Sequence, residues 1–133
     1  MIFRRLDHLG IAVRDLEEAG RRWTEDLGFT FLHREVLEEQ GVEVLMLDGG
    51  NCHVELLAPH GENSPIAKYL ERRGEGLQQA AFAVEDMDRA LEFLKGRGLL
   101  PIAPPSIGAG GRRVCFLHPK NVNGVLLELV EDR

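Results

Sequence analysis

The chain has 133 residues, of which 44% are hydrophobic, and its formal net charge at pH 7 is −6, with acidic and basic residues interspersed. This length fits one domain that can bury a core, and the acidic balance argues against nucleic acid as a main partner. No apolar run approaches the ~18 residues that a membrane span needs. The N-terminus, M-I-F-R-R-L-D-H, lacks the apolar region of a signal peptide. We therefore expect a cytoplasmic protein that does not enter a membrane. Cys52 and Cys115 lie far apart in apolar runs, so we expect both to be buried as small hydrophobic residues.

Two parts of the sequence are related by an internal repeat. The segment L-D-H-L-G-I-A-V-R-D-L-E-E-A, which begins at Leu6, aligns with L-Q-Q-A-A-F-A-V-E-D-M-D-R-A, which begins at Leu77. V-E-L-L at 54–57 aligns with L-E-L-V at 127–130. We interpret these segments as two copies of one module, at about residues 1–60 and 75–133, within a single domain. A linker helix at about residues 64–74 joins them.

The sequence pattern of each module predicts the element order βαβββ. In the first module an alternating strand at 5–13 precedes a helix that Asp15 caps and that runs to about Leu27. Three strands follow, at 30–36, 42–47 and 52–57. In the second module a strand at 77–84 precedes a helix that Asp86 caps and that runs to about Lys95, and the strands fall at 100–102, 112–117 and 125–130. The prediction is an α+β fold in which two tandem βαβββ modules form a curved mixed sheet around an inner cavity.

Strand alternation predicts which polar side chains face that cavity. His8 and Gln79 occupy equivalent places in the two first strands, and Glu55 and Glu128 occupy equivalent places in the two last strands. A carboxylate in the middle of an apolar strand needs a cation or an ion-pair partner. One interpretation is a divalent-metal site with one nitrogen and three oxygen ligands, which suits Co²⁺, Mn²⁺, Zn²⁺ or Fe²⁺. The alternative is that both glutamates pair with arginines or reach solvent at the ends of the sheet.

Several motifs give the chain a family resemblance. L-D-H-L-G-I-A-V, V-E-L-L-A-P, S-P-I-A-K-Y-L and I-G-A-G-G-R-R-V-C-F-L-H-P-K together cover most of its length. With the paired modules, they resemble the vicinal oxygen chelate superfamily of glyoxalases, bleomycin resistance proteins and dioxygenases. Within that superfamily the chain most resembles the methylmalonyl-CoA epimerases. The G-A-G-G and H-P-K run and S-P-I-A-K are the motifs most specific to the epimerases.

The resemblance implies a metal ion held by His8, Glu55, Gln79 and Glu128. It also shows a departure, because the family has a histidine where this chain has Gln79. An amide oxygen is a weaker and harder donor than imidazole. We expect Co²⁺ or Mn²⁺ first, with Zn²⁺, Mg²⁺ or Fe²⁺ as alternatives. Three consequences stay open: weaker metal binding, a different substrate, or loss of catalysis with binding retained.

The resemblance further implies an isomerase that interconverts (R)- and (S)-methylmalonyl-CoA by proton transfer at C2 through an enolate. Inversion requires a base on one face of C2 and an acid on the other. Glu128 is the first candidate for this chemistry. Glu43, the nearest carboxylate on the strand after E-Q-G-V, is the second. A slip of one residue would turn Glu43 to the opposite face of the sheet.

Arg112, Arg113, His118 and Lys120 are the residues that we expect to contact the CoA phosphates or the substrate carboxylate, because they surround the glycine-rich segment at 108–111. A homodimer is the expected assembly, by analogy with the superfamily. Two other functions fit the same residues. One is a different enzyme of the superfamily, such as a glyoxalase-like lyase. The other is a small-molecule binding protein without catalysis.

Overall fold

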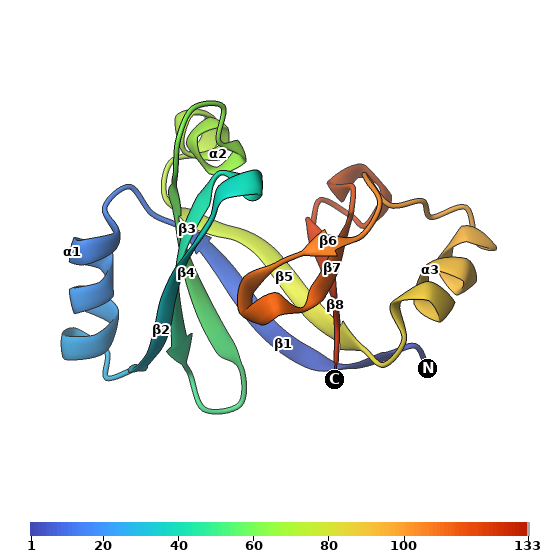
Figure 1. Cartoon of the computed structure of the whole chain (residues 1–133), viewed down its shortest axis with the longest axis horizontal. Helices are drawn as coiled ribbons and strands as arrows, with labels where there is room; N and C mark the ends of the chain where they lie inside the picture. The colour runs from blue at the N-terminus through green and yellow to red at the C-terminus, as the bar shows by residue number, and fades with distance from the viewer. Residues whose placement is uncertain (133) are drawn as a thin grey trace. The chain divides into compact units, whose positions relative to one another are not determined.

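The structure is a computed structural model that describes residues 1–132. Its strands form one hydrogen-bonded order, β2-β3-β4-β1-β5-β8-β7-β6. The chain divides into two compact units (Figure 1), which we describe separately. The first-module unit is His8–Gln78, and the second-module unit combines Met1–Asp7 with Gln79–Arg133. The predicted modules differ from these units at both edges, because residues 1–7 group with the second module and the linker helix groups with the first.

The first-module unit has the predicted order of elements. Strand β1 begins in the other unit and continues into this one, and helix α1 is followed by a π-helical turn. The bounds are β1 (Phe3–Ala12), α1 (Leu16–Arg21), the π-helical turn (Arg22–Asp26), β2 (Thr30–Leu37), β3 (Val42–Asp48), β4 (His53–Pro59) and α2 (Pro65–Arg73). The Asp15 carboxylate accepts hydrogen bonds from the backbone N–H groups of Glu17 and Glu18, at 3.0 and 3.1 Å. This cap confirms the predicted start of the first helix.

The second-module unit repeats this order. Its bounds are β5 (Gly76–Val84), α3 (Met87–Lys95), β6 (Ser106–Ile107), β7 (Arg113–Leu117) and β8 (Leu127–Glu131). Asp86 caps α3 through the backbone N–H of Arg89 at 3.1 Å, as predicted. The same parallel pairing closes both modules, since β1 pairs with β4 and β5 pairs with β8. The remaining strands of each module add in antiparallel order. The α+β class and the repeated βαβββ order are therefore confirmed.

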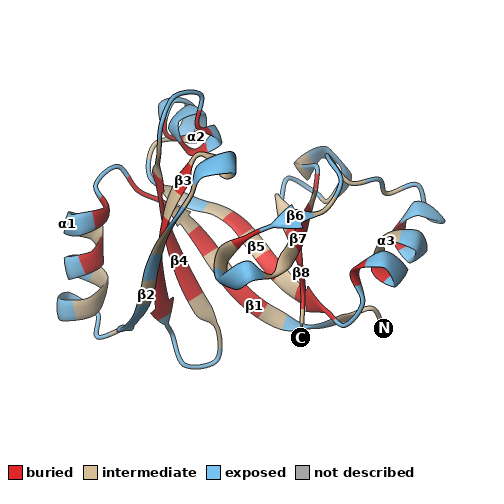
Figure 2. Cartoon of the chain, in the orientation of Figure 1, coloured by how far each residue is buried: buried red, intermediate tan, exposed pale blue. Residues whose placement is uncertain are grey.

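Each unit has its own apolar core between its sheet and its helix. In the first-module unit, one face of β3 and β4 packs against the start of α1, through Leu45, Leu47, Val54, Leu56 and Leu16. In the second-module unit, Met87, Ala90 and Leu94 of α3 pack on Cys115, Leu117 and Leu129. Figure 2 shows these buried stripes on the helices. Because strand residues alternate between faces, the residues next to these core positions point to the face away from the helix.

Two local predictions differ from the structure. The strand predicted at 100–102 is reduced to a single bridge between Pro101 and Leu117, and the third strand of the module is the short β6 instead. Proline lacks a backbone N–H, so the run containing Pro101, Pro104 and Pro105 cannot sustain a ladder of strand hydrogen bonds.

Cys52 is half-buried in the turn before β4, whereas Cys115 is buried, and burial raises the pKa of the Cys115 thiol. Within residues 1–132, no helix is both long and apolar enough to cross a membrane.

Candidate functional site

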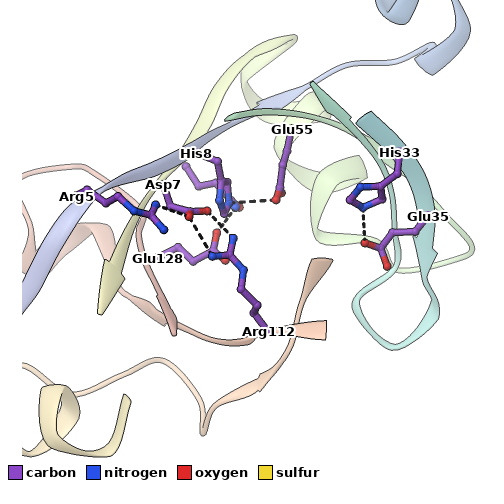
Figure 3. Close-up of polar contacts among 9 residues, drawn as sticks. Arg5, Asp7, His8, His33, Glu35, Glu55, Arg112 and Glu128 are labelled. Carbon is purple, nitrogen blue, oxygen red and sulfur yellow. Dashed lines mark hydrogen bonds and ion pairs between the residues drawn. The ribbon is translucent and has the colours of Figure 1, made fainter. Parts of the chain in front are cut away.

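Two predicted ligands lie together in the first-module unit. His8 on β1 and Glu55 on β4 are only 2% and 5% exposed. The Nε2 atom of His8 lies 3.3 Å from Oε2 of Glu55, a contact drawn in Figure 3. Both side chains point away from the helix-side core, because Ile11, Val54 and Leu56 occupy that face. The parallel register of β1 and β4, which pairs Gly10 with Glu55, produces this meeting.

The second-module unit holds the other two predicted ligands in the same way. Gln79 on β5 and Glu128 on β8 are 9% and 4% exposed. The amide Nε2 of Gln79 donates a short hydrogen bond to Oε1 of Glu128. The parallel register pairs Ala81 with Glu128. In both units, therefore, the first-strand residue lies two positions before the partner of the glutamate. The repeat is a structural symmetry as well as a sequence pattern.

The donor atoms of each pair are of kinds that bind divalent cations. Each pair contains one buried carboxylate, Glu55 or Glu128, whose partner is an imidazole or an amide. Within residues 1–132, no group of three or more His, Cys, Asp or Glu side chains is assembled as a metal cluster. Each unit presents one pair of donors, and one member of the second pair is a glutamine.

Glu43 lies on the other face of its strand. The pairing of β3 with β4 places Met46 beside Glu55, so even-numbered residues of β3 share the face of Glu55. Glu43 points to the helix side, where its Oε2 accepts a hydrogen bond from Nε of Arg34 at 2.7 Å. Arg34 also contacts Glu17 of α1. These hydrogen bonds, with Glu43 the larger contributor, raise the pKa of the Arg34 guanidinium. The structure therefore places Glu43 on the face opposite to Glu55. This is the difference of one residue in register that turns Glu43 away from the predicted catalytic face.

Arg112 has an internal acidic partner. Its two terminal nitrogens contact both carboxylate oxygens of Asp7, at 3.0 and 2.6 Å, and Asp7 is buried. Arg5 contacts the same carboxylate at 2.7 Å. The pair ties the end of the glycine-rich segment to β1, next to Gly110 and Gly111, whose φ angles of 74° and 77° favour glycine. Arg112 thus orders this loop, a role that the sequence did not reveal for Asp7.

The other three residues predicted to contact CoA lie in different settings. Arg113 points to the helix side, where it lies 3.2 Å from Asp88 and 3.8 Å from Glu131. His118 begins the turn after β7, and its Nδ1 accepts a hydrogen bond from the backbone N–H of Lys120 at 3.0 Å. The Lys120 side chain is exposed. His118 is exposed as well, whereas Arg113 is partly buried.

A His–Glu pair on β2 was not anticipated from the sequence. Nε2 of His33 lies 3.0 Å from Oε1 of Glu35 (Figure 3). The signal for it was present in the H-R-E spacing, because alternate residues of a strand share a face. The face that the pair occupies is set by the register of β2, β3 and β4, which the spacing alone does not fix.

Comparison with known proteins gives consistent relatives. A family model described as the glyoxalase/bleomycin resistance protein/dioxygenase superfamily matches residues 7–116. An ethylmalonyl-CoA/methylmalonyl-CoA epimerase of Cereibacter sphaeroides is 41% identical over 128 residues, which cover 94% of this chain and 96% of that protein.

Two solved structures are also similar to the chain. A methylmalonyl-CoA epimerase of Mycobacterium tuberculosis superposes with a TM-score of 0.94 at 38% identity, over 99% of this chain and 90% of that one. A variant of the Streptomyces coelicolor methylmalonyl-CoA epimerase, in complex with 2-nitronate-propionyl-CoA, has a TM-score of 0.92 at 39% identity, over 98% of both chains. Fold and sequence similarity therefore extend over nearly the whole chain.

Proposed function

We propose that this chain, which belongs to the glyoxalase/bleomycin resistance protein/dioxygenase superfamily, is an epimerase that interconverts (R)- and (S)-methylmalonyl-CoA by proton transfer at C2. The observation that supports this most is the pair of buried polar couples, His8 with Glu55 and Gln79 with Glu128, at equivalent positions of the repeat. The similarity to named epimerases over nearly the full chain supports the substrate.

We propose His8, Glu55, Gln79 and Glu128 as the ligands of one divalent ion. Enzymes of this superfamily typically use such a metal. Co²⁺ and Mn²⁺ are our first candidates, because the donor set combines one imidazole with three oxygen donors, and Zn²⁺, Mg²⁺ and Fe²⁺ remain alternatives. When bound, the ion supplies electrostatic stabilisation of the negative charge that develops on the substrate oxygens.

The protein side chains would perform the remaining steps. Glu128 takes the C2 proton or returns it, because its carboxylate is the buried basic group beside Gln79. Lys120, whose backbone N–H donates a hydrogen bond to Nδ1 of His118, binds a CoA phosphate as a point charge. Arg112 acts by holding the glycine-rich loop rather than by contacting CoA. Glu43 is not retained as a catalytic residue, because it faces α1.

The first test is exchange of the C2 proton of methylmalonyl-CoA in D₂O, followed by NMR. We expect exchange that requires Co²⁺ or Mn²⁺ and that EDTA abolishes. The readout of metal occupancy is isothermal titration calorimetry on the same protein. If a folded, metal-loaded protein shows no exchange, the epimerase assignment fails.

One observation favours a second function, that of a small-molecule binding protein. The face of β3 that carries Met46 beside Glu55 continues with Val42 and Val44, and the acidic group that β3 provides there is Asp48 at its end, which accepts a hydrogen bond from the backbone N–H of Gly50. A protein that binds an acyl-CoA in calorimetry but catalyses no exchange would match this alternative. Exchange with methylmalonyl-CoA would exclude it.

Replacing Gln79 with histidine is expected to tighten Co²⁺ or Zn²⁺ binding by about tenfold or more, since imidazole is the better donor for these ions. Titration calorimetry measures the Kd directly. Gln78→His is the matched control, because Gln78 is adjacent on β5 but points to the opposite face. Equal affinities of wild type and Gln79→His would argue against Gln79 as a ligand.

The homodimer and the cytoplasmic location stay predictions.

A further inference from the structure

The His33–Glu35 pair lies on the same face of the first-module sheet as Glu55. Antiparallel pairing places His33 beside Met46 and Glu35 beside Val44. The next pairing places Met46 beside Glu55 and Val44 beside Leu57. Directly paired residues of neighbouring strands project to the same face. The intervening Arg34 points to the other face, where it contacts Glu43 and Glu17.

The hydrogen bond between the two side chains orients the imidazole. An ionised carboxylate only accepts hydrogen bonds, so Glu35 assigns the proton of neutral His33 to Nε2. Nδ1 is then the nitrogen that can take up or deliver a proton. A histidine held in this way by a carboxylate is the arrangement that general acid–base catalysis uses, because the carboxylate stabilises the imidazolium. Both side chains are partly exposed, so substrate can reach them.

Few other side chains on this face of the first-module sheet could act as an acid or a base in place of His33. Along the same face, β3 and β4 present Val42, Val44, Met46 and Leu57, which are apolar. Asp48 at the end of β3 accepts a hydrogen bond from the backbone N–H of Gly50 at 2.8 Å and so supports the turn. His53 also lies on this face, beside His8, and is without a carboxylate partner among the contacts of the described chain.

The repeat shows that the pair is specific to the first module. In the second-module unit the corresponding row across the strands is Ala83, Val130, Val114 and Ser106. Serine therefore stands where the first module has Glu35. Two strand spacings, roughly 10 Å, separate the backbones of Glu55 and His33. Met46, which is buried, lies between these two strand positions.

We propose that His33 is the second acid–base group of the epimerisation, with Glu35 as its positioning residue. This inference rests on the proposed function. In one direction the general base of the proposed function takes the C2 proton, and the C–H electron pair passes into the enolate. The His33 imidazolium then gives its Nδ1 proton to the opposite face of C2 and keeps the proton on Nε2. The reverse direction uses the same groups in opposite order, and exchange with solvent restores their protonation.

The test follows each epimer of methylmalonyl-CoA separately in D₂O. In His33→Asn we expect one epimer to exchange its C2 proton without inversion, while kcat for inversion falls by at least about 10²-fold. In Glu35→Gln we expect a smaller loss of kcat with little change in KM. His60→Asn is the matched control, because His60 forms a similar pair with Glu38 at 3.0 Å elsewhere on the unit. It is expected to behave as wild type.

Each result has a clear meaning. Inversion of both epimers at the wild-type rate by His33→Asn overturns the inference while leaving the epimerase function intact. Equal loss of exchange for both epimers in a folded His33→Asn also overturns it, because a single-face base cannot cause that loss. If His33→Asn does not fold, the Glu35→Gln split between kcat and KM decides. A wild-type protein that exchanges neither epimer overturns the proposed function, and with it this inference.

Discussion

Replacing Glu128 with glutamine is expected to lower kcat for epimerisation by about 10²–10⁴-fold, the usual contribution of a general acid–base group. Glutamine has nearly the same shape, and its amide oxygen can still accept the hydrogen bond that Gln79 donates. The substitution therefore removes the base and the negative charge with little change in packing. The measurement is the rate of C2 proton exchange in D₂O at saturating metal, together with circular dichroism to establish that the variant is folded.

Glu43→Gln is the control for this prediction. Glu43 is a carboxylate of the same sheet, but it faces α1 and pairs with Arg34. A partly exposed pair of this kind contributes at most about 1 kcal/mol to stability, so the control is expected to fold and to keep its activity. Loss of exchange in Glu43→Gln and not in Glu128→Gln would reverse the roles that we assign.

The metal and the proton-transfer roles of Glu128 can be separated. If Glu128 acted only as a ligand, raising the metal concentration would restore kcat in Glu128→Gln. If it also transfers the proton, kcat stays low at full metal occupancy, as measured by calorimetry. Glu55→Gln provides the comparison, because Glu55 is the equivalent proposed ligand without a proposed acid–base role.

The repeat made much of this molecule predictable. Alternation within β1 and β4 was enough to place His8 and Glu55 on one face, because the apolar residues between them must pack on α1. The same argument held for Gln79 and Glu128, and the parallel registers of the two modules then proved equivalent. The caps at Asp15 and Asp86 were predictable too, since an aspartate directly before a helix commonly accepts hydrogen bonds from the backbone N–H groups of the first turn.

Features that depend on exact register or on distant partners were not predictable. A glutamate at position 43 reads as an inward residue or an outward one depending on a single residue of register. The bond between Asp7 and Arg112 joins residues 105 positions apart, and no local pattern announces such a pair. The third strand of the second module moved to β6, because three prolines occupy the segment where alternation alone predicted a strand.

Replacing Leu56 with alanine is expected to cost about 2–5 kcal/mol of the free energy of unfolding, the range for a leucine removed from a packed core. Leu56 is fully buried between Leu45 and the helix-side residues of β1 and α1. It lies next to Glu55 on β4, so the same backbone that presents the proposed ligand is held in place by this contact. The measurement is urea unfolding followed by the fluorescence of Trp23, which packs against this core.

Leu27→Ala is the matched control, because Leu27 is more than half exposed after the π-helical turn, and its truncation is expected to change stability by at most about 0.5 kcal/mol. If Leu56→Ala were as stable as this control, the core would not depend on the β4 side chain that faces α1. The assignment of opposite faces to Leu56 and Glu55 would then lose its energetic support. A large loss in Leu56→Ala alone would instead tie the position of Glu55 to hydrophobic packing behind it, since a strand whose helix-side residues are locked must present its alternate residues to the other face.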